Sequence, residues 1–109
     1  MGYDKELAER IRAFLKDKPG IDEKKMFGGI CFLLHGNMVC GVLNNDLIVR
    51  VGPEKYGDSL RFPHARPFDI TGRAMKGWIM VSAEGHKKSQ DLAYWVKQGL
   101  AFTSQLPAK

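Results

Sequence analysis

The stretch that decides the fold reads Ile30-Cys31-Phe32-Leu33-Leu34-His35-Gly36-Asn37-Met38-Val39-Cys40-Gly41-Val42-Leu43-Asn44-Asn45-Asp46-Leu47-Ile48-Val49-Arg50-Val51. It contains three short apolar runs, 30–35, 38–43 and 47–51, separated by residues that favour turns. Gly36-Asn37 predicts a two-residue hairpin loop, because glycine at the first loop position is typical of a type II′ turn. Asn44-Asn45-Asp46 predicts the second turn. The stretch therefore predicts three antiparallel strands.

Alternation along these strands predicts apolar side chains on both faces of the sheet. With Gly36-Asn37 and Asn45-Asp46 as the turns, both cysteines lie on one face as diagonal neighbours, so a disulfide would need distorted geometry. Because a two-layer domain would leave one apolar face in water, we expect another helix or a partner subunit to cover it. One face carries Cys31, Leu33, His35, Met38, Cys40, Val42, Leu47, Val49 and Val51, and the other Ile30, Phe32, Leu34, Val39, Gly41, Leu43, Ile48 and Arg50.

Two longer helices are predicted at the ends of the chain. Residues 4–18 place Leu7, Ile11, Phe14 and Leu15 on one stripe, with Asp4 as the N-cap and Pro19-Gly20 as the end. The last helix begins with Ser89 as the N-cap. Its stripe consists of Leu92, Trp95, Val96, Gly99, Leu100 and Thr103, which makes Trp95 a core residue and leaves Tyr94 exposed. Glycine in a helix interior costs about 1 kcal/mol relative to alanine, so we expect Gly99 to pack closely against another backbone.

The remaining segments complete one α+β domain spanning residues 1–109. Residues 53–60 predict a short helix, 67–71 and 77–82 predict strands, and 23–27 enters the sheet or leads into it. Residues 83–88 predict a polar turn that contains His86. The predicted order is α-β-β-β-α-β-β-α, a sandwich with an antiparallel sheet. The longest apolar run, 26–34, is too short to span a bilayer, and the first residues lack the apolar core of a secretory signal. We therefore expect a cytoplasmic protein that does not associate with membranes.

Basic charge is concentrated in residues 61–78, beside two phenylalanines and a tryptophan. Residues 61–76 hold four Lys/Arg and one Asp, whereas the net charge of the whole chain is +5. A local basic patch suits an anionic partner such as nucleic acid or a phosphorylated small molecule. Arginine forks match phosphate and carboxylate groups, and aromatic rings can stack on bases. The predicted binding residues are Arg66, Arg73, Lys76 and His64.

The alternative for this segment is structural. Asp69 would pair with one of the arginines, Thr71-Gly72 would form a turn, and the aromatic side chains would fill the core. The prolines at 63 and 67 serve an irregular connection into the next strand whether or not anything binds.

Cysteines and histidines form no catalytic or metal-binding pattern in the sequence. Cys31 and Cys40 lie in apolar strands, where buried thiols behave as small hydrophobic groups. His35, His64 and His86 lack the fixed spacing of metal ligands, which favours surface or capping roles. The chain also lacks a Gly-rich phosphate loop and a dinucleotide fingerprint. We therefore expect no cofactor, no metal and no catalytic site.

Several short motifs, taken in order, resemble the N-terminal domain of TfoX/Sxy-type competence regulators. The resemblance implies an α-β(3)-α-β(2)-α fold similar to type III secretion chaperones, a fold whose members commonly pair as dimers. It implies no catalytic residues. The motifs are Met26-Phe27-Gly28-Gly29, Gly36-Asn37-Met38, Leu47-Ile48-Val49-Arg50-Val51, Pro63-His64-Ala65-Arg66-Pro67, Thr71-Gly72-Arg73, Met75-Lys76-Gly77-Trp78, Trp95 and Leu106-Pro107.

Competence regulators of this family carry a second, C-terminal helical domain, whereas this chain ends at Lys109. The chain therefore resembles the stand-alone version, and a role in competence is not carried over. We expect a non-catalytic regulatory module that binds a protein partner or pairs as a homodimer. The alternative is nucleic-acid or anion binding through residues 61–78.

Overall fold

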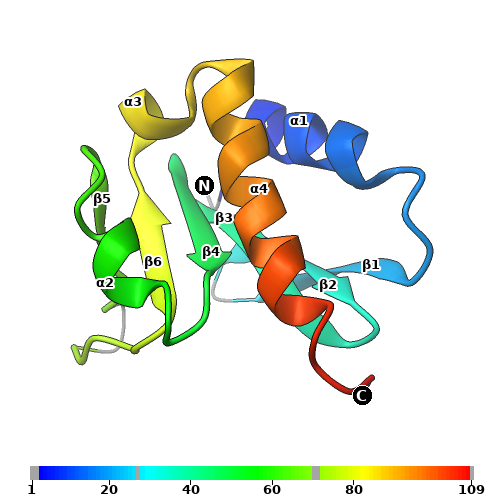
Figure 1. Ribbon diagram of the computed structural model, residues 1–109. Coiled ribbons are helices and arrows are strands. Elements are labelled where there is room, and N and C mark those ends of the chain that lie inside the picture. Colours follow the sequence, from blue (N-terminus) through cyan, green and yellow to red (C-terminus); the bar gives the residue numbers. More distant parts are fainter. Residues whose placement is uncertain (1–2, 27, 70–71, 109) are drawn as a thin grey trace.

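The computed structural model describes residues 3–26, 28–69 and 72–108, and their strands form one antiparallel sheet (Figure 1). The strand order is β1-β2-β3-β4-β6-β5. The predicted α+β class with an antiparallel sheet is confirmed. The elements are α1 (Lys5–Leu15), β1 (Ile21–Met26), β2 (Gly29–Leu34), β3 (Asn37–Leu43), β4 (Asp46–Arg50), α2 (Tyr56–Ser59), β5 (Ala65–Pro67), β6 (Trp78–Val81), α3 (Ala83–His86) and α4 (Ser89–Thr103).

The element order differs from the predicted one in two places. β1 is a full strand, so four strands precede α2 instead of three, and residues 83–86 form the helix α3 instead of a turn. The first strand was hard to predict because its four central side chains are charged and exposed, as edge strands often are. The strand predicted at 67–71 is found as β5 at 65–67, and Ile70 and Thr71 lie outside the described residues.

The turn between β2 and β3 lies one residue earlier than predicted. Leu34 pairs with Asn37, so His35 and Gly36 form the loop. Both have positive φ angles, 50° and 86°, which is the type I′ combination with glycine in second place. Asn37 belongs to the strand instead, and its buried side-chain amide donates a hydrogen bond of 2.9 Å to the Pro107 carbonyl.

A bulge in β3 changes which residues share a face. The pairing register shifts just after Phe32, which leaves Val39 as an extra residue on β3. Beyond the bulge Cys31 faces Gly41 and Cys40 faces Phe32, so the cysteines lie on opposite faces of the sheet, not on one face as predicted. Both thiols are free, which agrees with the prediction of no disulfide.

The turn between β3 and β4 also differs by one residue, since Leu43 pairs with Asp46 and the loop is Asn44-Asn45. This difference leaves the faces unchanged, because moving a two-residue turn by one position shifts the pairing by two.

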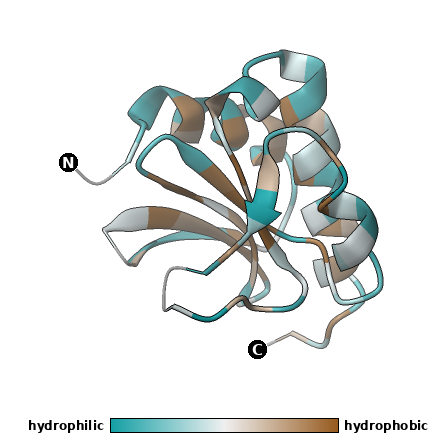
Figure 2. Ribbon diagram, turned by 90° about the vertical axis from the view of Figure 1, so that its left-hand side faces the viewer, coloured by the Kyte–Doolittle hydropathy of each residue, from teal (hydrophilic) through white to brown (hydrophobic). Residues whose placement is uncertain are grey.

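The helices cover one face of the sheet, and in the view of Figure 2 they lie above and to the right of the strands. In α4, Gly99 packs directly on the bulge: a Cβ there would lie 2.6 Å from the Val39 carbonyl oxygen. The close backbone contact predicted for Gly99 is therefore confirmed. The main core includes Leu7, Ile11, Leu15, Ile30, Phe32, Leu34, Val39, Cys40, Val42, Leu47, Val49, Val51, Ile79, Val81, Leu92, Trp95 and Val96.

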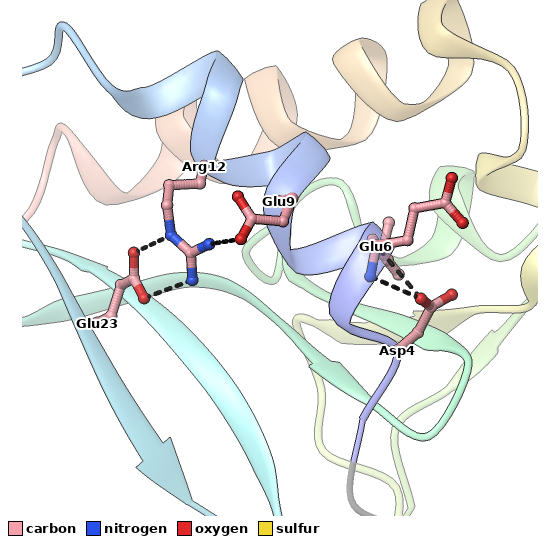
Figure 3. Close-up of polar contacts among 6 residues, drawn as sticks. Asp4, Glu6, Glu9, Arg12 and Glu23 are labelled. Carbon is pink, nitrogen blue, oxygen red and sulfur yellow. Dashed lines mark hydrogen bonds and ion pairs between the residues drawn. The ribbon is translucent and has the colours of Figure 1, made fainter.

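The helix ends agree in part with the prediction. Asp4 caps α1, since its Oδ1 accepts hydrogen bonds from the Glu6 and Leu7 amides at 3.0 and 3.2 Å (Figure 3). Phe14, predicted on the buried stripe of α1, is 45% exposed because it lies at the border of that stripe. Ser89 is the first helical residue of α4, so the predicted N-cap position belongs to Lys88.

The other face of the sheet, here called the helix-free face, carries a second cluster. Its buried members are Cys31, Met38, Ile48, Phe68 and Met80, with Met26, Leu43 and Trp78 partly buried around them. All of them come from strands or from the segment after β5, and none from a helix. The helix expected over this face is therefore absent from the described residues, and the ring of Phe68 closes part of it.

Across residues 3–26, 28–69 and 72–108, no helix combines the length and the apolar character needed to cross a membrane.

Candidate functional site

The four predicted binding residues are distributed along the β5–β6 hairpin. His64 precedes β5, in a left-handed conformation with φ 71°, and its carbonyl accepts a hydrogen bond of 2.9 Å from the Ser82 amide. Arg73 and Lys76 lie in the loop at the opposite end of the same hairpin. The structure therefore does not bring the four side chains into one cluster.

Arg66 is already paired within the chain. Its Nη2 donates a hydrogen bond of 2.8 Å to Oδ2 of Asp46, which begins β4. Arg66 faces Met80 in the β5–β6 pairing, and this places it on the helix-free face, with Met80 between it and Ile48. The structural alternative had Asp69 pairing with one of the arginines of this segment. Arg66 does pair with a carboxylate, but it is that of Asp46.

Arg73 and Lys76 lie together on the exposed loop between β5 and β6. Hydrogen bonds from the Gly72 amide to the Asp69 carbonyl (2.8 Å) and from the Met75 amide to the Phe68 carbonyl (3.1 Å) shape this loop. In the part of the chain that the structure describes, neither cation forms an ion pair with a carboxylate. These two residues are the part of the predicted site that stays open to an anion.

Exposed aromatic rings gather on the helix side. Phe62 and Tyr94 are 40% and 38% exposed and stack with their centroids 5.2 Å apart. Trp95 packs edge-on against both rings and is itself buried. The predictions of a core Trp95 and an exposed Tyr94 are therefore confirmed, and Phe62 lies with Tyr94 on the surface.

The helix-free face was not identified as a continuous surface from the sequence. Met26, Leu33, Leu43 and Trp78 are only partly buried there, over the buried cluster of Met38, Met80 and their neighbours. The guanidinium of Arg50 borders this face, 5.1 Å from the centre of the Trp78 ring and 5.3 Å from that of Phe102. The signal available in the sequence was its methionine content, because three of the chain's five methionines belong to this cluster.

A pocket of about 310 Å³ lies between the C-terminal half of α4 and residues 51–55. Gly52 is required at its wall, since it has φ 90° and a Cβ would lie 2.4 Å from the Phe102 ring. The polar lining combines Glu54 and Lys55, whose charges offset each other, with two glutamines. This arrangement does not select one class of ligand.

The histidines serve structural contacts. His86, predicted in a polar turn, is buried in α3, and its Nε2 lies 2.9 Å from the Asn45 carbonyl oxygen. The carbonyl of His86 accepts a hydrogen bond of 3.0 Å from Arg10 of α1. In the described ranges, no three His, Cys, Asp or Glu side chains are grouped so that they could hold a metal ion.

Both cysteines are shielded from solvent. Burial raises the pKa of the Cys31 thiol, and burial together with the proximity of Cys31 raises that of Cys40 to about 12. Since the thiolate is the reactive form, neither sulfur is set up as a nucleophile at neutral pH.

We expect the thiols to react with a disulfide reagent such as dithionitrobenzoate only after unfolding. The folded Cys40 keeps its proton up to about pH 12, whereas the unfolded thiol loses it near its ordinary value of 9.0. The folded state therefore binds more protons between these values, and the free energy of unfolding should fall as pH rises from 9 to 12.

Absorbance at neutral pH, with and without guanidinium, measures the reaction of the thiols with dithionitrobenzoate. Rapid labelling of the native protein would contradict the burial of both sulfurs.

Comparison with known families agrees with the resemblance that the motifs carry. A family model described as the TfoX N-terminal domain matches residues 13–103, which is most of the chain. Neither the curated proteins nor the solved structures that were compared gave a match. The chain therefore belongs to the TfoX N-terminal domain family.

Proposed function

We propose that this domain is a non-catalytic regulatory module that binds another protein through the helix-free face. The observation that carries the proposal is the set of apolar side chains on that face that no helix of the described chain covers. Met26, Leu43 and Trp78 remain partly accessible above the buried cluster. Membership of the TfoX N-terminal domain family supports the regulatory part of the proposal.

The chemistry of the face suits a protein partner. Methionine side chains are flexible and adapt to differently shaped apolar surfaces, and tryptophan is frequent among the residues that dominate binding energy. Charged side chains surround the apolar centre: Lys24 faces Cys31 across β1 and β2, Arg50 faces Trp78, and Arg66 faces Met80. An apolar centre with a polar rim is the usual layout of a protein interface.

The test is affinity capture from extracts of cells that express the protein. The double variant Met26→Lys/Leu43→Lys places two charges on the helix-free face, and Phe14→Lys/Tyr94→Lys places two on the helix side. Proteins captured by the wild type should also be captured by Phe14→Lys/Tyr94→Lys. They should not be captured by Met26→Lys/Leu43→Lys. Retention of the same proteins by both variants would contradict the proposed surface.

The proposal includes self-association as a homodimer, in line with the pairing that the family resemblance implies. Size-exclusion chromatography with light scattering should give the mass of two chains across a dilution series. A mass of one chain at every concentration would contradict the dimer, but it would leave binding of a different protein untouched.

A second candidate function is the binding of nucleic acid through Arg73 and Lys76. It is supported by the exposure of both cations and by their lack of ion pairs within the described residues. We expect Arg73→Ala/Lys76→Ala to weaken binding to single-stranded DNA or RNA and to lower the salt slope by about 1.4, from two phosphate contacts at about 0.7 each. The matched control is Lys87→Ala/Lys88→Ala, two exposed lysines on another part of the surface. Equal binding by both variants in a fluorescence titration at low salt would exclude this site.

A further inference from the structure

We infer that the homodimer forms through the outer edge of β1, which pairs antiparallel with β1 of a second copy to make one continuous sheet. This inference rests on the homodimer of the proposed function and assigns its surface. It leaves the helix-free face available for a different protein.

β1 offers the longer of the two sheet edges. It has six residues and pairs only with β2 among the described strands, so its outer backbone groups have no strand partner there. The opposite edge, β5, has three residues, with Pro63 shortly before it and Pro67 as its last residue. Because proline donates no backbone hydrogen bond, β5 is a poor template for another strand, whereas β1 contains no proline.

The charge order of β1 is complementary to itself. Two acidic residues, Asp22 and Glu23, precede two basic residues, Lys24 and Lys25, and all four are exposed. In an antiparallel pair the two strands run in opposite directions, so the acidic half of one lies beside the basic half of the other. A second copy of this chain is therefore a matching partner for this edge.

The geometry of a sheet restricts the register. Residues that face each other across two strands must point to the same face of the sheet. The two-fold axis therefore lies midway between the two copies of one residue, so that this residue faces its own copy. With the axis at Lys24, Glu23 faces Lys25 of the second copy. The two Lys24 side chains then face each other, and each lies diagonal to Asp22 of the other copy. With the axis at Glu23, Asp22 faces Lys24 of the second copy. Both registers place acidic side chains beside basic ones.

Arg12 of α1 prepares Glu23 for this pairing. Its guanidinium donates two hydrogen bonds to the Glu23 carboxylate, at 2.5 and 2.8 Å, and also contacts Glu9 at 2.8 Å (Figure 3). The hydrogen bonds from Arg12 lower the pKa of Glu23 and hold its carboxylate in a fixed position. Arg12 also offsets the repulsion between the two Glu23 side chains in the register centred on that residue.

Charged side chains on an edge strand often prevent unwanted pairing. A strand with charges of one sign would repel every copy of itself. The mixed order of β1 instead repels a parallel copy, in which like charges face each other, and attracts an antiparallel one. The same charges can therefore exclude other strands and select a second copy of this chain.

The test is an exchange of charges, measured by sedimentation velocity. Asp22→Lys/Glu23→Lys makes the strand entirely basic, and Lys24→Glu/Lys25→Glu makes it entirely acidic. Each variant should sediment as a monomer under conditions in which the wild type is a dimer. An equimolar mixture of the two should recover the dimer mass, because each acidic strand then faces a basic one.

Circular dichroism first establishes that both variants are folded. If the basic variant is unstable because it loses the Arg12–Glu23 contact, Asp22→Lys replaces it and leaves that contact intact. A wild-type monomer, variants that remain dimeric, or a mixture that stays monomeric would each overturn the inference. Persistent dimers that Leu43→Lys, a substitution in β3 away from the β1 edge, dissociates would assign self-association to the helix-free face.

Discussion

Gly99→Ala is expected to lower the free energy of unfolding by about 2 kcal/mol, since overpacking costs about 3 kcal/mol and alanine returns about 1 kcal/mol of helix propensity. The added Cβ would lie 2.6 Å from the Val39 carbonyl oxygen and 2.9 Å from Val39 Cγ1. α4 must therefore move away from the β3 bulge that it covers. Urea denaturation followed by circular dichroism measures the loss.

Gly57→Ala is the matched control for this substitution. Gly57 is also helical, in α2, but a Cβ there meets no atom within 4 Å. Its stability should stay unchanged or rise, by at most about 1 kcal/mol from helix propensity. If both alanine variants behaved alike, the close packing of α4 on the bulge would be contradicted.

Phe32→Ala should cost about 4 kcal/mol, the largest loss expected from a single substitution considered for this chain. Phe32 has no exposed surface, and it faces Cys40 under the helices. Removing its ring would leave a cavity in the main core that the packed strands can fill only in part. Thermal and urea unfolding should both show the effect.

Phe14→Ala provides the comparison, because the sequence pattern had placed Phe14 in the core as well. Its side chain is 45% exposed on α1, so its removal should change stability by less than about 1 kcal/mol. A loss as large as that of Phe32→Ala would mean that α1 packs through a different stripe.

The apolar strands β2, β3 and β4 were predictable because each is an apolar run that ends at turn residues. β1 was not fully predictable: Asp22 to Lys25 carry no apolar alternation, and a charged edge strand resembles a solvated loop in sequence. Each of the two turns lies one residue earlier than predicted. The exact position of a turn depends on long-range side-chain contacts, such as the hydrogen bond from Asn37 to the Pro107 carbonyl.

The bulge had the largest consequence for the predicted faces. Met38 to Val42 are apolar or small, so alternation cannot reveal that Val39 is the extra residue. The Gly99 contact with Val39 shows what the bulge accommodates, namely the close approach of α4, and it depends on packing between segments far apart in the sequence. The faces of β2 and β3 were therefore mismatched in the prediction.

The basic segment was located from composition, but its partners were not. Arg66 pairs with Asp46 because β4 and β5 both pair with β6, an adjacency that no local pattern indicates. Arg73 and Lys76 are exposed on the loop between β5 and β6. The helix-free face depends on which side the helices occupy, and this is a property of the whole fold.

Oxidative footprinting of the protein within its captured complex tests the central claim, that the helix-free face is the surface for protein binding. Oxidation of Met26 and Trp78 should fall on complex formation, relative to the purified protein, because both are partly accessible on that face. Phe14 and Tyr94 on the helix side should be modified to the same extent in both samples. Protection of Phe14 and Tyr94, with Met26 and Trp78 unchanged, would contradict the claim.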